Sequence, residues 1–203
     1  MKEYKSELLF AAEYKITEFS QLTDFSYGGV TMKFFITGER NVGKSYLVER
    51  IKPVVKYRGF ETRFDNDLEN LYMNFYEGDS LLIGTRESGR LRIVEEGFLF
   101  ATKLLGSLDI PNDNLLIMDE IGFLEEDSPE FQQAVVSSLR RAKHCLCILR
   151  MGNFSFIDHL KRSMGIGSIE LTAANREDVF GRVVREIEKE RANLPSPGGD
   201  EGI

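Results

Sequence analysis

Apolar runs and amphipathic stretches alternate along most of the chain. The apolar runs are short and rich in Phe, Ile and Leu, which is typical of strands buried on both faces. They lie at residues 32–37, 60–64, 114–118, 144–149 and 168–171. The stretches between them repeat apolar residues at helical spacing, at residues 46–55, 96–105, 129–141, 157–164 and 175–192. This alternation predicts an α/β domain in three layers, with a mostly parallel sheet covered by helices on both faces.

The segment between the second and third apolar runs has a different pattern. Three β-like runs, 71–76, 81–86 and 91–94, follow one another with only turn-forming residues between them. The turns contain Gly78 and Gly89, flanked by Glu, Asp and Ser. We therefore expect an antiparallel excursion on one edge of the sheet.

The two ends of the chain differ in character from the middle. Residues 1–31 contain a short amphipathic stretch and then a glycine turn, so we expect an N-terminal extension. Three alternatives are open for it: it packs on the sheet, it packs on a partner, or translation starts at Met32. Residues 193–203 are rich in Pro, Gly and acidic residues, which predicts a disordered tail. The predicted domain spans residues 32–192.

The composition limits the class of protein. The 203 residues are 42% hydrophobic and 29% charged, as expected for one soluble domain with a sizeable core. The formal net charge of −7 argues against nucleic-acid binding, which needs a basic excess. No apolar stretch reaches the ~20 residues that cross a bilayer, and the N-terminus lacks a signal peptide's apolar segment. We predict a cytoplasmic protein without nucleic-acid or membrane partners.

A phosphate-binding loop motif follows the first predicted strand. Residues 38–45 match G-x-x-x-x-G-K-[S/T] at every fixed position. Gly38 and Gly43 let the backbone wrap closely, so that its N–H groups point at a β-phosphate. Lys44 supplies a positive charge for the β- and γ-phosphate oxygens, and the Ser45 hydroxyl is a Mg²⁺ ligand. Because a strand precedes the loop and a helix follows it, the anion would sit at a helix N-terminus.

Two adjacent carboxylates end a later strand. Asp119 and Glu120 follow the apolar run 115–118. An acid at the carboxyl edge of a parallel sheet is where Mg²⁺ bound to a triphosphate needs a direct or outer-sphere oxygen ligand, and Asp119 is the candidate. Glu120 is then the candidate base that orients or deprotonates an attacking water. A base beside the metal ligand favours hydrolysis over transfer of the phosphoryl group to another acceptor.

The transition state of phosphoryl transfer needs a further cation. Arg150 ends the next predicted strand after Asp119, and Arg162 lies on the short helix beyond it. We take both as candidate catalytic residues, with an ordinary surface arginine as the alternative for each.

Several stretches together resemble a known family. Residues 119–125, Asp-Glu-Ile-Gly-Phe-Leu-Glu, resemble the D-E-I-G-x-x-E signature of the small P-loop nucleoside-triphosphatases, the group that includes the cancer-related nucleoside-triphosphatase. Residues 59–62, 131–139 and 171–176 agree with the same family, so the resemblance covers about residues 32–190. It implies a RecA/AAA-like sheet and Mg²⁺-dependent hydrolysis of several nucleoside triphosphates with little base selectivity. It also implies that Arg176 lies near the nucleotide base.

The loop departs from the family pattern. The family carries a third glycine and small residues where this chain has Glu39, Arg40 and Asn41, and Tyr46 replaces a commoner Thr. Asn41 tolerates positive φ at modest cost. Glu39 adds negative charge next to a polyphosphate, so Arg40 is the expected compensating cation. The residues expected to bind the nucleotide are Gly38, Glu39, Arg40, Asn41, Val42, Gly43, Lys44, Ser45, Tyr46 and Arg176.

Three functions remain after these observations. The first is a Mg²⁺-dependent nucleoside-triphosphatase acting on ATP, GTP and other triphosphates. The second is a small-molecule or nucleotide kinase, and the third is a nucleotide-gated binding module with negligible turnover. A protein partner or a homo-oligomer is compatible with each.

Overall fold

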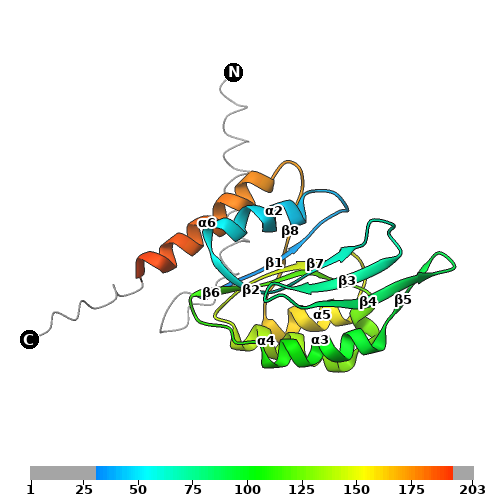
Figure 1. Ribbon diagram of the computed structural model, residues 1–203. Coiled ribbons are helices and arrows are strands. Elements are labelled where there is room, and N and C mark those ends of the chain that lie inside the picture. The colour runs from blue at the N-terminus through cyan, green and yellow to red at the C-terminus, as the bar shows by residue number, and fades with distance from the viewer. Residues whose placement is uncertain (1–30, 194–203) are drawn as a thin grey trace, which may run out of the picture.

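The computed structural model describes residues 31–193 (Figure 1). The expected N-terminal extension, apart from Thr31, and the expected tail, apart from Asn193, lie outside the described residues. The strands are β1 (Met32–Thr37), β2 (Lys56–Phe64), β3 (Asn70–Phe75), β4 (Ser80–Glu87), β5 (Arg90–Ile93), β6 (Asn114–Ile121), β7 (His144–Leu149) and β8 (Ser168–Glu170). The helices are α2 (Lys44–Ile51), α3 (Glu95–Ser107), α4 (Pro129–Arg141), α5 (Ser155–Met164) and α6 (Arg176–Asn193), with short 3-10 helices η2 (Lys52–Val54) and η3 (Leu124–Asp127).

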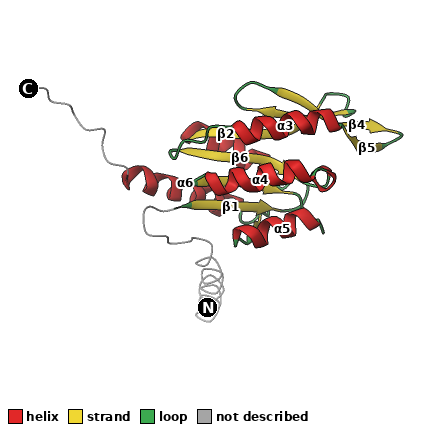
Figure 2. Cartoon of the chain, turned by 90° about the horizontal axis from the view of Figure 1, so that it is seen from below, coloured by secondary structure: helices red, strands yellow, loops and turns green. Residues whose placement is uncertain are grey.

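The predicted three-layer architecture is confirmed. One eight-stranded sheet has the order β5-β4-β3-β2-β6-β7-β1-β8. Strands β2, β6, β7, β1 and β8 pair in parallel, and β3, β4 and β5 continue the sheet as antiparallel neighbours. Helices α2 and α6 cover one face, and α3, α4 and α5 cover the other (Figures 1 and 2).

The pleat of the central strands divides their side chains between two cores. In β6, Leu115 and Ile117 pack in the core under α2 and α6, whereas Leu116 and Met118 pack in the core under α3, α4 and α5. Successive side chains of a strand point to opposite faces. Asp119 therefore continues the α2 side of the pleat, and this alternation directs it toward the helix that follows the phosphate loop.

Two strands are longer than their apolar runs indicate. Strand β6 continues beyond Met118 to Ile121, and β2 begins at Lys56 rather than Phe60. Polar residues continue these strands because neighbouring strands pair with them: Glu61 lies opposite Asp119. The acidic pair thus lies within β6. Asp119 pairs with Glu61 of β2 and Ile148 of β7, and the register with β7 shifts between Asp119 and Ile121.

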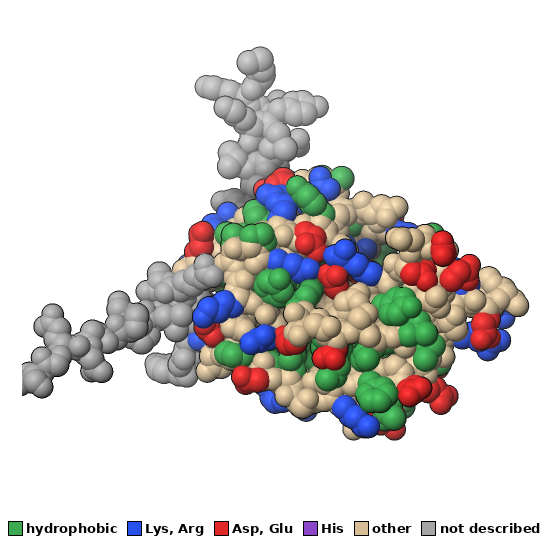
Figure 3. Space-filling model, viewed as in Figure 1, with side chains coloured by type: hydrophobic (Ala, Val, Ile, Leu, Met, Phe, Trp, Pro, Cys, Tyr) green, Lys and Arg blue, Asp and Glu red, His purple; other side chains and the backbone are tan. Residues whose placement is uncertain are grey.

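The surface shows no concentration of one charge on the face drawn in Figure 3. Basic and acidic side chains are interspersed there over the described residues. Within residues 31–193, no helix combines the length and the apolar character needed to cross a bilayer.

Candidate active site

The loop between β1 and α2 folds as an anion cradle. Helix α2 begins immediately after Gly43, which adopts φ 100°, and Asn41 adopts φ 66°. Both values lie in the left-handed region, which glycine and asparagine tolerate best. In phosphate-binding loops, turns of this kind direct backbone N–H groups of the loop and of the first helical turn toward one point, so this backbone conformation suits phosphate binding.

Gly38 is fixed by its contact with the segment that follows β8. A Cβ at Gly38 would lie 2.5 Å from the carbonyl oxygen of Leu171, and the Leu171 N–H donates to the Thr37 carbonyl at 2.7 Å. No side chain fits in that gap. The edge strand β8 therefore sets the shape of the loop entrance.

The side chain of Lys44 folds back and bonds to carbonyl groups at the start of the phosphate loop. Its Nζ donates to the carbonyl oxygens of Gly38 (2.8 Å) and Glu39 (2.9 Å), and its side chain is 10% exposed. The ammonium group also lies 4.0 Å from the Glu120 carboxylate. Lys44 is therefore placed at the mouth of the loop, within reach of an incoming phosphate.

Asp119 near the end of β6 accepts a hydrogen bond from Ser45 in the first turn of α2. Burial raises the pKa of Asp119 to about 6, a rise that a hydrogen bond from Ser45 partly offsets and that the charges of Glu120 and Glu61 increase. A buried carboxylate with too little compensating positive charge is a favourable place for a cation. Within residues 31–193, no group of three or more His, Cys, Asp or Glu side chains could hold a metal by itself. A Ser hydroxyl and one carboxylate suit Mg²⁺, which takes its other oxygens from phosphates and water.

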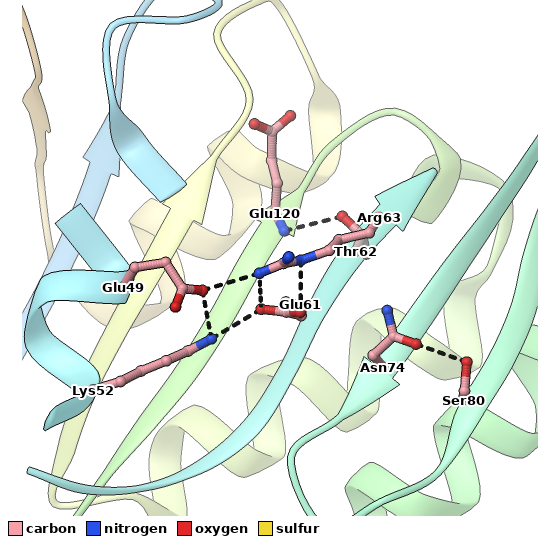
Figure 4. A network of polar contacts seen from close by, with 8 residues as sticks. All are labelled: Glu49, Lys52, Glu61, Thr62, Arg63, Asn74, Ser80 and Glu120. Atoms are coloured by element: carbon pink, nitrogen blue, oxygen red, sulfur yellow. Dashed lines mark hydrogen bonds and ion pairs between the residues drawn. The ribbon is translucent and has the colours of Figure 1, made fainter. Parts of the chain in front are cut away.

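Glu120 lies between two cations. One carboxylate oxygen is 4.0 Å from Lys44 Nζ and the other is 3.8 Å from Nη1 of Arg150. Its backbone N–H donates to the Thr62 hydroxyl on the neighbouring strand at 3.2 Å. Figure 4 shows the side chain extending from β6 away from the other labelled residues. The backbone is thus held from β2 while the carboxylate stays half-exposed and accessible to solvent.

Strand order explains why Arg150 reaches this point. Strand β7 lies between β1, which leads to the phosphate loop, and β6, which carries the acidic pair. Arg150 follows the last residue of β7, and its N–H donates to the Ile121 carbonyl at 2.8 Å. Its guanidinium carbon lies 5.0 Å from the centre of the Phe123 ring. The arginine is therefore positioned from both neighbouring segments.

A network of ion pairs fastens α2 and the following η2 to β2 (Figure 4), and its member Glu61 lies opposite Asp119. Lys52 Nζ bonds Glu49 and Glu61, each at 2.9 Å. Arg63 contacts the same two carboxylates, at 3.0 Å and 2.6 Å. The side chains of Lys52 and Glu61 are 13% and 14% exposed, so solvent screens that pair less than the others. The network anchors the end of the helix whose first turn forms the cradle.

Residues of the phosphate loop and the acidic pair line one cleft of about 650 Å³, whereas the four residues of the ion-pair network do not. Of the predicted site residues, it brings together Gly38, Arg40, Lys44, Ser45, Asp119, Glu120 and Arg150. Glu39, Asn41, Val42 and Gly43 belong to the same loop without lining the cleft. Arg162 lies exposed on α5 and is not among the lining residues.

Arg176 lies on the other side of the loop. A Cβ at Gly43 would be 2.9 Å from Nη1 of Arg176, so the arginine packs directly on the loop backbone. Its guanidinium carbon is 5.5 Å from the centre of the Tyr46 ring, which is itself 54% exposed. Arg50 lies nearby and pairs with Glu177 at 2.7 Å. Flat cationic and aromatic groups therefore gather outside the cradle, away from the acidic pair.

Two residues with a place in the site had no role in the sequence prediction. The Thr62 hydroxyl accepts the N–H of Glu120, and Glu125 is a buried carboxylate that lines the cleft. Both belong to stretches that carry the family resemblance, 59–62 and 119–125. Their position in these stretches was the only sequence feature that pointed to Thr62 and Glu125. It does not indicate what either side chain contacts.

Glu125 gives the protein a specific dependence of stability on pH. Burial raises its pKa to about 7, although hydrogen bonds from the backbone N–H groups of Gly122 and of Glu125 lower it. The folded-state pKa exceeds the ordinary value of 4.5. Folding therefore takes up a proton between these values, and stability falls as the pH rises through that window. Above pH 7 the whole cost is present, about 3 kcal/mol by the usual conversion.

The variant Glu125→Gln should lack this component. We expect its free energy of unfolding, relative to wild type, to rise by about 3 kcal/mol between pH 4.5 and pH 8. Urea denaturation of both proteins across that range measures the difference, and any pH-independent cost of the amide cancels. Parallel pH profiles would contradict the prediction.

Comparisons with known proteins find nucleoside-triphosphatases among the chains that are similar to this one. A protein-family model described as NTPase matches residues 87–184. The nucleoside-triphosphatase THEP1 of Thermotoga petrophila is 24% identical over 83% of this chain and 100% of the relative. THEP1 of Pyrococcus abyssi is 27% identical over 78% of this chain and 93% of the relative. The solution structure of a human cancer-related nucleoside triphosphatase superposes with a TM-score of 0.64 at 20% identity, over 79% of this chain and 99% of that one.

Proposed function

We propose that this chain is a small P-loop nucleoside-triphosphatase, which hydrolyses ATP, GTP and other nucleoside triphosphates to the diphosphate and phosphate with Mg²⁺. One observation carries the proposal. The Glu120 carboxylate lies between Lys44 and Arg150 at the mouth of the phosphate loop. A base next to the cations that would bind the γ-phosphate is the arrangement that attack by water requires.

The loop and its lysine bind the polyphosphate. The N–H groups around Gly43 and the first turn of α2 receive the β-phosphate, and Lys44 moves from its two loop carbonyls to the β- and γ-phosphate oxygens. Ser45 and Asp119 would hold Mg²⁺. When bound, the ion neutralises charge on the β- and γ-phosphates.

Glu120 has two successive tasks. Before nucleotide binds, its charge compensates Lys44 and Arg150. An arriving γ-phosphate takes over both cations, and the carboxylate is then free to accept a proton from the attacking water. The P–O bond to the β-phosphate breaks as the water oxygen bonds to phosphorus, and Arg150 stabilises the charge on the γ-oxygens.

The nucleobase of the bound triphosphate lies outside the cleft, near Arg176 and Tyr46. The guanidinium and the phenol ring offer flat surfaces for stacking, and stacking does not depend on the pattern of donors and acceptors on the base edge. We therefore expect similar affinities for purine and pyrimidine triphosphates.

The proposal is tested by phosphate release from a panel of triphosphates with and without Mg²⁺. We expect turnover of ATP, GTP, CTP and UTP with Mg²⁺, and at least a tenfold lower rate when EDTA removes the ion. Tight nucleotide binding without phosphate release would contradict the proposal and favour the nucleotide-gated binding module.

A kinase is the second candidate, because part of the cleft lining is apolar. Phe64, Leu91, Phe123 and Met151 line the cleft, and a polyphosphate does not need such side chains. A phosphoryl acceptor with an apolar body would fit there. In the same assay a kinase would form diphosphate in excess of free phosphate, together with a phosphorylated product, when nucleosides, nucleotides or small alcohols are added. Equal amounts of diphosphate and phosphate under all these conditions would exclude it.

A cytoplasmic location is part of the same proposal, because that compartment supplies nucleoside triphosphates. The two cysteines, Cys145 and Cys147, are buried and not disulfide-bonded. Reduced, packed thiols are compatible with that compartment.

A further inference from the structure

The turn after β6 contains a buried carboxylate that the proposed chemistry does not use. Glu125 is 3% exposed, and its Oε2 accepts the N–H of Gly122 at 2.7 Å. Side chains of glutamate are rarely buried without a specific partner. Here the partner is the backbone of the residue that follows the last residue of β6. Glu125 therefore fixes the direction in which the chain leaves the strand that carries the acidic pair.

The same turn is held from two other elements. Gln132 of α4 donates to the carbonyl oxygens of Glu125 (2.7 Å) and Glu126 (3.1 Å). Glu126 accepts the N–H of Phe156 at 2.7 Å and the hydroxyl of Ser155 at 2.6 Å, at the start of α5. Two consecutive glutamates thus reach in different directions, one to the end of β6 and one to the segment that follows Arg150.

Arg150 packs against the part of the turn that Glu125 holds. A Cβ at Gly122 would be 3.0 Å from Cδ and 3.3 Å from Cβ of Arg150. The adjacent Phe123 ring lies 5.0 Å from the guanidinium carbon. Any movement of this backbone would therefore move the arginine relative to Glu120, which lies 3.8 Å from it.

We infer that Glu125 is a positioning residue, which sets Arg150 against Glu120 through the backbone of Gly122 and the ring of Phe123. The inference rests on the proposed function, because it assigns Arg150 the task of stabilising the transition state. Glu125 itself touches neither nucleotide nor water in this role. Its loss should lower the chemical rate and leave nucleotide binding intact, since the phosphate loop is built from β1 and α2.

Removal of the carboxylate tests the inference. We expect Glu125→Ala to lower kcat at least tenfold, while the Kd of a non-hydrolysable triphosphate analogue with Mg²⁺ stays within threefold of wild type. Glu125→Gln keeps an oxygen acceptor for the Gly122 N–H and should recover part of the rate. Val135→Ala opens a cavity in the same core, at a residue that does not line the cleft. It controls for general destabilisation and should leave kcat within twofold.

A double-mutant cycle separates positioning from a purely structural role. If Glu125 acts through Arg150, Glu125→Ala should change kcat less than twofold in the Arg150→Ala background. Gly122→Ala should lower kcat with Glu125 intact, because the added methyl group displaces the arginine. Equal effects of Glu125→Ala with and without Arg150, or an unchanged kcat in Glu125→Ala, would overturn the inference. An Arg150→Ala protein with full kcat would also overturn it, and the proposed function would stand if Glu120→Gln still abolished turnover.

Discussion

Replacing Glu120 by Gln should lower the rate of phosphate release at least 100-fold, while nucleotide binding is retained or strengthened. The amide has nearly the same shape but cannot accept the proton of the attacking water, and a positioned general base contributes about 10²–10⁴ in rate. Binding should not weaken, because the carboxylate competes with the γ-phosphate for Lys44 and Arg150. Loss of that competing charge favours the bound state by linkage.

Single-turnover phosphate release and titration with a fluorescent triphosphate analogue measure these two quantities separately. Glu130→Gln is a matched control, because Glu130 is an exposed carboxylate in the first turn of α4. It should leave both quantities within twofold of wild type. A Glu120→Gln protein that hydrolyses triphosphates at the wild-type rate would remove the base from the proposed mechanism.

The second large effect is expected at Lys44. Replacing it by Ala removes the ammonium group that meets the β- and γ-phosphates and leaves the carbonyls of Gly38 and Glu39 without their donor. Charge-assisted hydrogen bonds to phosphate are about twice as strong as neutral ones. We therefore expect affinity for Mg²⁺–triphosphate to fall at least tenfold and phosphate release at saturating nucleotide to fall about 100-fold.

Lys56→Ala is the control for this variant. Lys56 is 73% exposed and pairs with Asp113 at the opposite end of β2, so its loss removes the same charge from a residue that does not line the cleft. Thermal unfolding of both variants shows whether the fold is kept. Wild-type affinity in Lys44→Ala would mean that the loop binds polyphosphate through its backbone alone.

The sheet and its helices follow from local patterns. The apolar runs of β1, β6 and β7 are buried on both faces, and their alternating side chains divide between two cores. The antiparallel part of the sheet also follows, because Gly78 and Gly89 occupy turns with positive φ. Strand ends were less predictable. The polar ends of β2 and β6 form strands because they pair with neighbouring strands of the sheet. The local sequence does not reveal which strands will pair.

The candidate site is predictable only where one segment carries it. The phosphate loop and the acidic pair are local motifs, and the structure brings them together as expected. Local sequence does not show that Arg150 lines the cleft and Arg162 does not, because this depends on β7 lying between β1 and β6. The contact of Glu125 with Gly122 depends in the same way on how the turn after β6 is held by α4 and α5.

The two ends of the sheet have a consequence for how molecules of this protein meet. The outermost strands are β5, with four residues, and β8, with three. An edge strand presents unpaired N–H and C=O groups to which a strand of another molecule can bind, and a longer edge presents more of them. So few residues offer an approaching chain only a few hydrogen bonds, and fibre-like polymerisation through the sheet is disfavoured. The helical layers offer a different surface for self-association at high concentration, because Leu99 and Phe100 of α3 are exposed.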